Sequence, residues 1–269
     1  MKLAVLDWGI GGFGLVRELL VREPAMPLVY FSDAGTTPYG LLSRAALRAR
    51  LGVVARFLRD LGTTHLAIAC NAASSVLQQD ADLAEDLVIS NVVSHGVDLV
   101  LASGAREVGL VGGRRTVRSG AHRRAIEARG GRVSLSSRVA QPLSAFVELG
   151  DLSSDEVREA VFRVVAPLRH VSALLLACTH YPAIAPLFHE ALPKVALLDP
   201  APAMAMALVS RKRPRRELAD AANVVALTTG GPRALERAAL RAFRVTIRGA
   251  RRVPPDLGAS APRAPERRA

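Results

Sequence analysis

The chain has 269 residues with a formal net charge of +12; 50% of its residues are hydrophobic and 4% are aromatic. This length suffices for one large or two small domains, and no apolar run is long enough to span a membrane. So few aromatic residues exclude a stacking platform for single-stranded nucleic acid, and two distant cysteines exclude a disulfide framework. Almost all of the positive charge is arginine scattered over expected helices, so we expect a cytoplasmic protein without membrane association or a specific nucleic-acid partner.

Strands and helices alternate along the first third of the chain. A helix is expected after the glycines of residues 9–14, a long amphipathic helix over 42–61, and another helix over 72–79. Apolar runs predict buried strands at 3–6, 28–31, 65–69 and 87–93. This alternation is typical of a parallel sheet whose strands are joined by crossover helices.

The same alternation restarts after residue 92. One helix opens at a capping box formed by Ser153 and Glu156 and runs to Pro167. Further helices are expected at 97–103, 116–129, 183–192, 201–210 and 232–243, and strands at 106–113, 132–135, 173–177, 195–199 and 223–229. The predicted fold class is therefore α/β, with two parallel-sheet halves of similar plan.

The layout predicts two α/β domains and a tail. Residues 1–92 and 206–247 form the first domain, because the last strand and helix look like one more unit of the first half. Residues 93–205 form the second domain. Residues 248–269 are rich in arginine and proline with few apolar anchors, so this basic tail is expected to be disordered. Another dense basic cluster, RKRPRR, occupies residues 211–216.

The two cysteines stand in matching contexts. Cys70 and Cys178 each end an apolar run, and each is followed by a small polar residue and a helical segment. Ligands bind beyond the carboxyl ends of parallel strands, so two thiols at two such ends could face one cleft and move protons at both faces of a carbon atom. A single free cysteine is more often a small buried hydrophobe, but that role does not explain two matched positions.

The glycine-rich loop allows three interpretations. Gly9, Gly11 and Gly14 have the spacing of a dinucleotide fingerprint, and Asp33 lies at the end of the next strand, where that fingerprint expects an acid. Against a nucleotide, the carboxylate of Asp7 would repel a pyrophosphate. The loop can instead be a nest of backbone amides that binds a carboxylate, or a tight turn that binds nothing.

Other polar residues and motifs give weaker evidence about function. His180 lies two residues after Cys178, where an imidazole can lower the pKa of a thiol or relay its proton. Glu148 alone would be a solvated charge at a helix end. The spacings of cysteine and histidine that hold zinc are absent, so we expect no metal site. There is no Gly-x-Ser-x-Gly elbow to support a serine hydrolase.

Taken together, these residues resemble the glutamate racemase and aspartate/glutamate racemase family over residues 1–247. The pairing of Ala-Cys-Asn with Cys-Thr-His-Tyr-Pro is the most specific part of the resemblance. The matching motifs are Asp7 with Gly9-Ile10-Gly11-Gly12, Asp33 through Pro38-Tyr39-Gly40, Ala69-Cys70-Asn71 with Ala73-Ser74, Val111-Gly112 through Thr116-Val117 and Ser119-Gly120, Val147-Glu148, and Ala177-Cys178-Thr179-His180-Tyr181-Pro182.

The resemblance implies a cofactor-independent amino-acid racemase, acting first of all on glutamate, with two pseudo-symmetric domains and the active site in the cleft between them. One thiolate would remove the Cα proton and the other thiol would reprotonate the opposite face. By this resemblance the catalytic residues are Cys70, Cys178, Asp7, His180 and Glu148, and the substrate-binding residues are Trp8, Pro38, Tyr39, Gly40, Asn71, Ala72, Thr116 and Thr179. It further implies a small amino-acid substrate, a role in peptidoglycan synthesis and a homodimer.

Two positions depart from the family pattern. The family usually has serine where this chain has Trp8, and threonine where it has Ala72. Both family residues carry hydroxyls that contact substrate, and a carboxylate that loses such partners costs a few kcal/mol to bind (roughly 1–3). The alternatives are therefore a diverged enzyme acting on aspartate or another small acid, a binding protein that has lost turnover, and a nucleotide-dependent enzyme.

Overall fold

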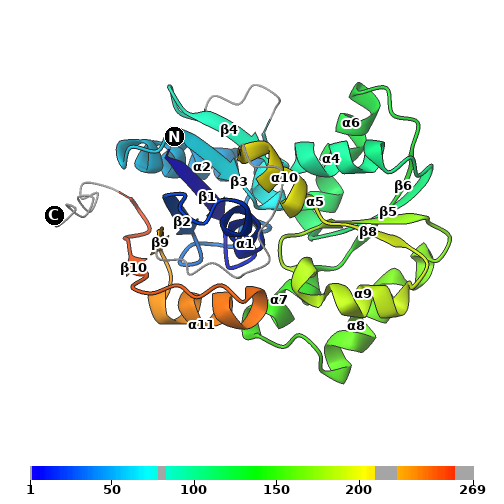
Figure 1. The fold of residues 1–269 in the computed structure, drawn as a ribbon. Helices are drawn as coiled ribbons and strands as arrows, with labels where there is room; N and C mark the ends of the chain where they lie inside the picture. The colour runs from blue at the N-terminus through cyan, green and yellow to red at the C-terminus, as the bar shows by residue number, and fades with distance from the viewer. Residues whose placement is uncertain (1, 78–82, 210–222, 258–269) are drawn as a thin grey trace.

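The structure is a computed structural model that describes residues 2–77, 83–209 and 223–257. The described residues form two parallel sheets, one of six strands and one of four, with helices packed on both faces (Figure 1). The predicted α/β class with two parallel sheets is confirmed. In these described segments, no helix has the length and apolarity that a membrane crossing requires.

The first sheet has the strand order β10-β9-β2-β1-β3-β4. Successive residues of its central strand point to opposite faces, so Leu3 and Val5 join one apolar cluster while Ala4 and Leu6 join another. Its strands are β1 (Leu3–Asp7), β2 (Leu28–Ser32), β3 (His65–Ile68), β4 (Val88–Asn91), β9 (Val224–Thr228) and β10 (Arg251–Arg252). Burial on both faces explains why β1, β2, β3 and β9 read as continuous apolar runs.

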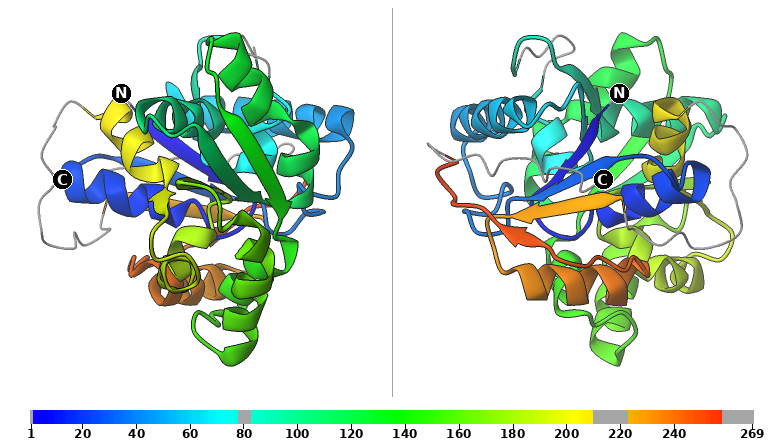
Figure 2. Two further views of the ribbon diagram at one scale, coloured as in Figure 1. Left: turned by 90° about the vertical axis from the view of Figure 1, so that its right-hand side faces the viewer. Right: turned by 60° about the vertical axis from the view of Figure 1, so that its left-hand side comes forward.

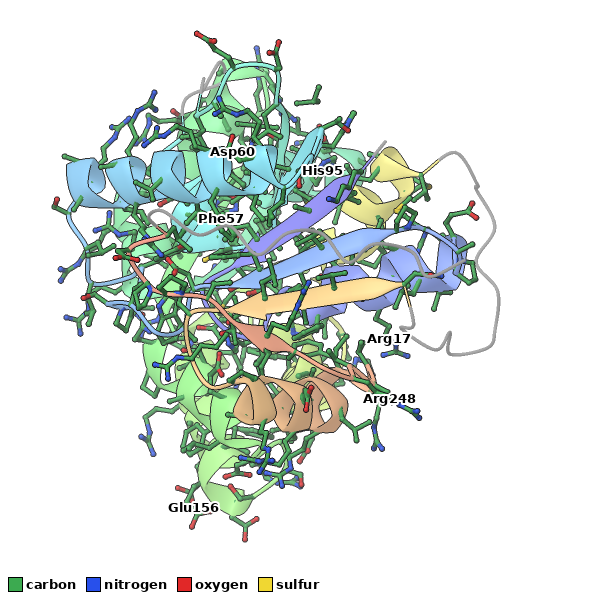
Figure 3. The ribbon with its side chains drawn as sticks, turned by 90° about the vertical axis from the view of Figure 1, so that its left-hand side faces the viewer. Arg17, Phe57, Asp60, His95, Glu156 and Arg248 are labelled. Atoms are coloured by element: carbon green, nitrogen blue, oxygen red, sulfur yellow. The ribbon has the colours of Figure 1, made fainter. Side chains whose placement is uncertain are left out.

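Helices cover both faces of the first sheet. Helices α1 (Phe13–Arg22) and α11 (Pro232–Phe243) supply residues to the apolar cluster on one face, and α2 (Arg44–Asp60) to the cluster on the other. Ser43 caps α2 by accepting a hydrogen bond from the amide of Ala46. Figure 3 shows Phe57 on the sheet-facing side of α2, where its ring centroid lies 5.7 Å from that of Phe31.

The second sheet has the strand order β6-β5-β7-β8. Its strands are β5 (Glu107–Gly112), β6 (Ser134–Val139), β7 (Ala173–Ala177) and β8 (Ala196–Leu198). Its helices are α4 (Val92–Ala102), α5 (Arg114–Ser119), α6 (Ala121–Ala128), α7 (Gln141–Leu149), α8 (Asp155–Val165) and α9 (Ala185–Ala191), with short 3-10 turns at Ala166–Leu168 and Tyr181–Ile184. One apolar cluster is shared by α1 of the first half and α8 and α9 of the second, so the core continues between the halves.

Helix α10 (Pro200–Leu208) lies between the two sheets in Figure 1 and packs against both α1 and α4. It therefore contacts a helix of each half. The domain boundaries at residues 92 and 205 remain a prediction for this reason. After residue 222 the chain adds β9 beside β2 in the first sheet.

The expected disorder of residues 248–269 is wrong for residues 248–257. Strand β10 pairs in parallel with β9, as the right-hand view of Figure 2 shows, and Val253 is buried. The main chain of Val253 also donates a hydrogen bond to the carbonyl of Thr228. The rest of that tail, 258–269, and the cluster at 211–216 lie outside the described residues.

Several helix boundaries also differ from those expected. The helix expected over 116–129 is two helices, because Gly120 has a left-handed backbone with φ of 63° and breaks it. The helix after Cys70 is only the four-residue α3 (Asn71–Ser74). The cap of α8 is Ser154, whose hydroxyl accepts from the amide of Val157, and not Ser153 as expected. Helix α4 starts earlier than expected because Asn91 caps it.

Candidate active site

The polar residues of interest lie where parallel strands end. Asp7 is the last residue of β1, Cys70 follows β3 and caps α3, and Cys178 follows β7 in the other sheet. Cys70 is 8% exposed and Cys178 is half-buried. The charge of a Cys178 thiolate is among the factors that raise the pKa of Cys70, so the two sulfur atoms lie within electrostatic range.

A hydrogen-bonded chain runs from Cys178 into the first half of the molecule. The sulfur of Cys178 lies 3.6 Å from Nδ1 of His180, and Nε2 of His180 lies 2.6 Å from Oε1 of Glu148. The same Oε1 atom accepts a hydrogen bond of 3.1 Å from the backbone amide of Ile10. Glu148 is thus not the solvated charge that its sequence context alone indicates; it joins helix α7 to the glycine loop after β1.

This chain determines the charge of its members. Burial alone would lower the pKa of His180, but its hydrogen bonds to Cys178 and Glu148 raise that pKa well above the ordinary value. Burial would likewise raise the pKa of Glu148, but the hydrogen bond from His180 lowers it. Near neutral pH, His180 is therefore a cation held between the sulfur of Cys178 and a carboxylate. A cationic neighbour favours the thiolate form of cysteine.

The second thiol has the opposite surroundings. Burial raises the pKa of Cys70 well above its ordinary range, and the nearby Asp7 carboxylate raises it further. Burial also raises the pKa of Asp7, against the lowering effect of His180. Oδ1 of Asp7 accepts from the amide of Gly9 at 3.3 Å, while its buried Oδ2 has no hydrogen-bond partner among the described residues. The two cysteines thus have unlike surroundings: burial and a carboxylate at Cys70, and the imidazole of His180 at Cys178.

Close contact with the second half explains the glycine spacing. A Cβ atom on Gly9 would lie 2.0 Å from Oε1 of Glu148, and one on Gly11 would lie 2.1 Å from Oγ1 of Thr179. A Cβ on Gly14 would make only ordinary contact, 3.5 Å from the ring of Phe243. The loop amide of Ile10 is used by the protein's own carboxylate. The loop therefore serves the contact between the halves and leaves no room beside Gly9 and Gly11 for a pyrophosphate.

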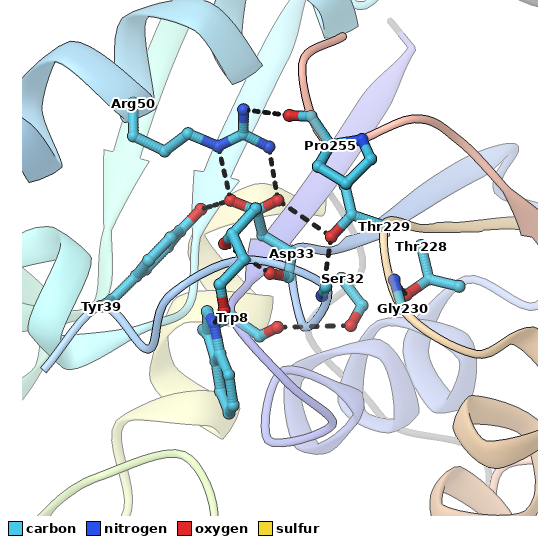
Figure 4. Close-up of polar contacts among 11 residues, drawn as sticks. Trp8, Ser32, Asp33, Tyr39, Arg50, Thr228, Thr229, Gly230 and Pro255 are labelled. Atoms are coloured by element: carbon cyan, nitrogen blue, oxygen red, sulfur yellow. Dashed lines mark hydrogen bonds and ion pairs between the residues drawn. The ribbon is translucent and has the colours of Figure 1, made fainter. Parts of the chain in front are cut away.

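Asp33 belongs to a buried ion pair. Its carboxylate accepts from Nε of Arg50 at 2.7 Å and from Nη2 of Arg50 at 2.6 Å, in the paired geometry typical of arginine and carboxylate (Figure 4). The hydroxyls of Tyr39 and Thr229 also donate to it, at 2.8 and 3.1 Å. Arg50 in turn donates to the carbonyl of Pro255 at 2.5 Å. All of the polar capacity of Asp33 is used within the protein, so it is not a free acid for a ribose.

The residues expected to bind substrate lie around this junction. Tyr39, Asn71 and Thr116 are buried, Gly40, Ala72 and Thr179 are half-buried, and Pro38 is exposed. A small cavity of about 20 Å³ lies between the halves, and Asn71, Cys178 and Thr179 are among its lining residues. Both polar atoms of the Asn71 amide are buried without a partner among the described residues. Such groups ordinarily bind water or a ligand.

Trp8 turns toward the loop of residues 33–40. Its indole nitrogen donates to the carbonyl of Thr36 at 3.2 Å, and Figure 4 shows Trp8 near the Asp33 ion pair. The ring packs against the same apolar cluster as Ala72, which includes Tyr39 and Cys70. The indole therefore fills space in the first half and offers no hydroxyl to a ligand. Ala72 likewise presents only a methyl group.

One functional candidate was missed in the sequence. Arg115 donates from Nε to the carbonyl of Tyr39 at 3.0 Å, which joins α5 to the loop before α2. The sequence feature that points to Arg115 is the arginine-dense stretch of residues 114–124, which follows an expected strand. No three or more His, Cys, Asp or Glu side chains gather into a possible metal site within 2–77, 83–209 and 223–257.

Comparisons with known proteins agree on one family. A family model described as Asp/Glu/Hydantoin racemase matches residues 21–208. Glutamate racemase of Gloeobacter violaceus is 30% identical over 235 residues, which cover 86% of this chain and 88% of the relative. Glutamate racemase from Thermus thermophilus, solved in complex with beta-chloro-D-alanine, is 30% identical with a TM-score of 0.78, covering 94% of this chain and 96% of that one.

A second solved structure extends the similarity in fold. Glutamate racemase from Francisella tularensis, in complex with D-glutamate, has a TM-score of 0.83 at 24% identity. The alignment covers 95% of this chain and 98% of that chain. The similarity therefore includes both sheets and the junction between them.

Proposed function

This chain belongs to the Asp/Glu/hydantoin racemase family and is an isomerase of the amino-acid racemase class; from that premise we propose that it interconverts L- and D-glutamate without a cofactor. The observation that carries the proposal is the asymmetric pair of thiols at two strand ends. One thiol is hydrogen-bonded to a cationic His180, and the other is kept protonated by burial.

The proposed reaction moves one proton onto the substrate and one proton off it. The Cys178 thiolate takes the Cα proton of the enantiomer whose Cα–H faces it, and the electron pair of the C–H bond passes to the α-carbon and its carboxylate. The Cys70 thiol then gives its proton to the opposite face. Cys178 ends as the thiol and Cys70 as the thiolate, so the reverse direction starts from that form.

The neighbouring residues tune the two thiols. Positioned donors stabilise the negative charge that develops at the α-carbon, and acid–base groups work best when their pKa values lie near the operating pH. His180 supports the Cys178 thiolate, Glu148 holds His180 in place, and Asp7 adjusts the charge beside Cys70. In this proposal Tyr39, Gly40, Asn71, Thr116 and Thr179 hold the amino and carboxylate groups of the substrate.

The cavity beside Cys178 holds about one water, since about 20 Å³ is close to the volume that one water needs (~10–15 Å³). In this proposal the halves move apart to admit glutamate and then close over it. Closure of this kind excludes water and aligns the reacting groups.

Incubation of the purified protein with L-glutamate, followed by chiral chromatography, tests the proposal. We expect equal amounts of L- and D-glutamate at equilibrium without any added cofactor. If the protein converts L-aspartate to D-aspartate but leaves glutamate unchanged, its substrate is aspartate and the proposed substrate is wrong. If neither amino acid is racemised, the proposed activity is wrong. In the cell this activity would supply D-glutamate for peptidoglycan in the cytoplasm.

The proposal includes a homodimer as the assembly. Size-exclusion chromatography with light scattering measures this directly. A mass of twice 28.6 kDa is expected, and a mass of 28.6 kDa at working concentration would contradict it.

A further inference from the structure

A second, larger cavity of about 310 Å³ lies between segments of the two halves. Neither cysteine lines it. Five arginines do: Arg44, Arg114, Arg115, Arg118 and Arg124. Arg44 starts helix α2 of the first half, and the other four belong to α5 and α6 of the second half. Its volume lies at the lower end of the range for small-molecule sites, about 300–1,000 Å³.

Within residues 2–77, 83–209 and 223–257, the arginines of this cavity have no acidic partner. Two of them bond instead to neutral carbonyl groups: Arg115 to Tyr39, and Arg124 to Ser119. A concave surface lined by one sign of charge attracts ligands of the opposite sign and raises their local concentration.

The arginine cavity adjoins the residues that the proposed reaction uses. Gly40 is part of its lining, and Thr116 lies in the sequence between Arg115 and Arg118. Ser75, also in the lining, follows the short helix α3 that Cys70 caps. At 1.5 Å of rise per residue, Ser75 is roughly 7 Å from Cys70 along that helix. Cys70 and a lining residue of the arginine cavity thus belong to one short segment of the chain.

The arginine cavity offers a binding place for the two carboxylates of the proposed substrate. The cavity beside Cys178 has the volume of about one water molecule, whereas the arginine cavity has about 310 Å³. A guanidinium group binds a carboxylate through two parallel hydrogen bonds. Several guanidinium groups in one cavity therefore suit a ligand with two carboxylates better than a ligand with one.

We propose that the arginine cavity is an anion-binding antechamber, which captures acidic amino acids by their carboxylates before they pass to the cysteines. This inference rests on the proposed function and adds a second binding site to it. Because the cavity is lined from both halves, a bound dicarboxylate bridges them. The lining contains no aromatic side chain, the usual platform for a nucleobase.

Steady-state kinetics of the double variant Arg114→Gln/Arg118→Gln test the antechamber. We expect kcat/KM for glutamate to fall about fivefold, through KM with kcat unchanged, because two of the five attracting charges are removed. The salt dependence of kcat/KM should also weaken. Arg44→Gln, on the opposite wall, should raise KM as well. The matched control is Arg233→Gln/Arg237→Gln, which removes the same charge from exposed positions on α11.

Calorimetry with glutarate tests whether the arginine cavity binds a dicarboxylate, without any turnover of substrate. Glutarate is a dicarboxylate without the amino group, so it can bind but cannot be racemised. The antechamber predicts that wild type and the α11 control bind glutarate alike and that Arg114→Gln/Arg118→Gln binds at least fivefold more weakly. Equal binding by all three proteins would overturn it. So would an equal loss in the control, or binding to duplex DNA that the same variant weakens more than binding to glutarate.

The two proposals fail in different ways. A wild-type protein that racemises glutamate, with KM unaffected by the cavity variants, would refute the antechamber alone. A wild-type protein that binds glutarate through Arg114 and Arg118 but racemises nothing would refute the proposed activity alone.

Discussion

At the scale of single residues, the two cysteines show how the same local sequence acquires different chemistry. Each follows an apolar strand and precedes a helical turn, but their neighbours differ. His180 lies beside Cys178, whereas burial and Asp7 raise the pKa of Cys70. A racemase needs this difference in its resting form, since one group must accept a proton while the other still carries one.

Restoring the missing hydroxyl at position 72 should improve glutamate binding. A hydrogen bond to a charged group contributes about 1.5–3 kcal/mol, so Ala72→Thr should lower KM for glutamate about tenfold or more. Ala72→Val has nearly the same shape without the hydroxyl and serves as the control. Initial racemisation rates at varied glutamate measure both. Equal KM values for the threonine and valine variants would show that no hydroxyl is needed there.

The pair formed by His180 and Glu148 predicts a defined pH dependence of stability. The pKa of His180 is raised in the fold, so its contribution is complete below the ordinary value of about 6.5 and is lost as the pH rises through the raised pKa. The pKa of Glu148 is lowered, so its contribution is complete above its ordinary value of 4.5 and is lost as the pH falls through the lowered pKa.

Thermal unfolding of wild type and Glu148→Gln across pH measures this pair. The difference in Tm should be greatest between about pH 4.5 and 6.5 and should shrink on both sides. Glu127→Gln, an exposed helix-end glutamate on α6, controls for the loss of one carboxylate. A difference in Tm that stays constant up to pH 10 would mean that His180 carries no proton shared with Glu148.

At the scale of elements, the C-terminal segment stabilises the first half. Strand β10 extends the sheet, Val253 is buried, and the carbonyl of Pro255 accepts from Arg50 of the Asp33 ion pair. Truncation after Ala250 removes all three contacts, and burial of one valine alone contributes about 1.5–3 kcal/mol. We expect a loss of about 3 kcal/mol in the free energy of unfolding, measured by urea denaturation.

A shorter truncation is the matched control for that experiment. Removal of residues 258–269 leaves β10, Val253 and Pro255 in place, so the stabilisation from these contacts should be retained. Equal losses for the two truncations would show that the contacts of residues 251–257 contribute nothing.

Most strands could be predicted from the sequence, because strands buried on both faces are continuous apolar runs. The end of a strand could also be predicted where a polar residue or a cysteine closes the apolar run, as at Asp7, Cys70 and Cys178. Strand β10 could not be predicted: its two arginines match no strand pattern, and it is held by pairing with β9. The break at Gly120 depends on a left-handed backbone, which a helical periodicity does not reveal.

The candidate active site could be predicted only in part, because some of its contacts join residues far apart in the sequence. The cysteines and His180 are recognisable from local spacing, but the role of Glu148 depends on contacts with His180 and with Ile10, 32 and 138 positions away in the chain. The arginine cavity combines Arg44 with residues 114–124, and only the fold brings them together. Trp8 could be placed only by the hydrogen bond to Thr36.

At the scale of the whole molecule, the two halves meet so closely that the glycine loop becomes part of the contact. A methyl group on Gly11 would overlap Thr179, whereas one on Gly14 would make ordinary contact with Phe243. Gly11→Ala should therefore separate the halves at the cysteines and reduce kcat at least a hundredfold, since small misplacements at a reacting centre have effects of about that size. Gly14→Ala should retain activity. Loss of activity in Gly14→Ala with none in Gly11→Ala would contradict this account of the loop.

The central claim is that two thiols exchange protons with one α-carbon. Proton NMR in D2O tests it most directly, by following the Cα–H signal of L- and D-glutamate with wild type, Cys70→Ser and Cys178→Ser. The account predicts exchange of the Cα proton of both enantiomers by wild type, and loss of racemisation in each single variant. Racemisation at the wild-type rate by either serine variant, or exchange that persists when both cysteines are replaced, would contradict it.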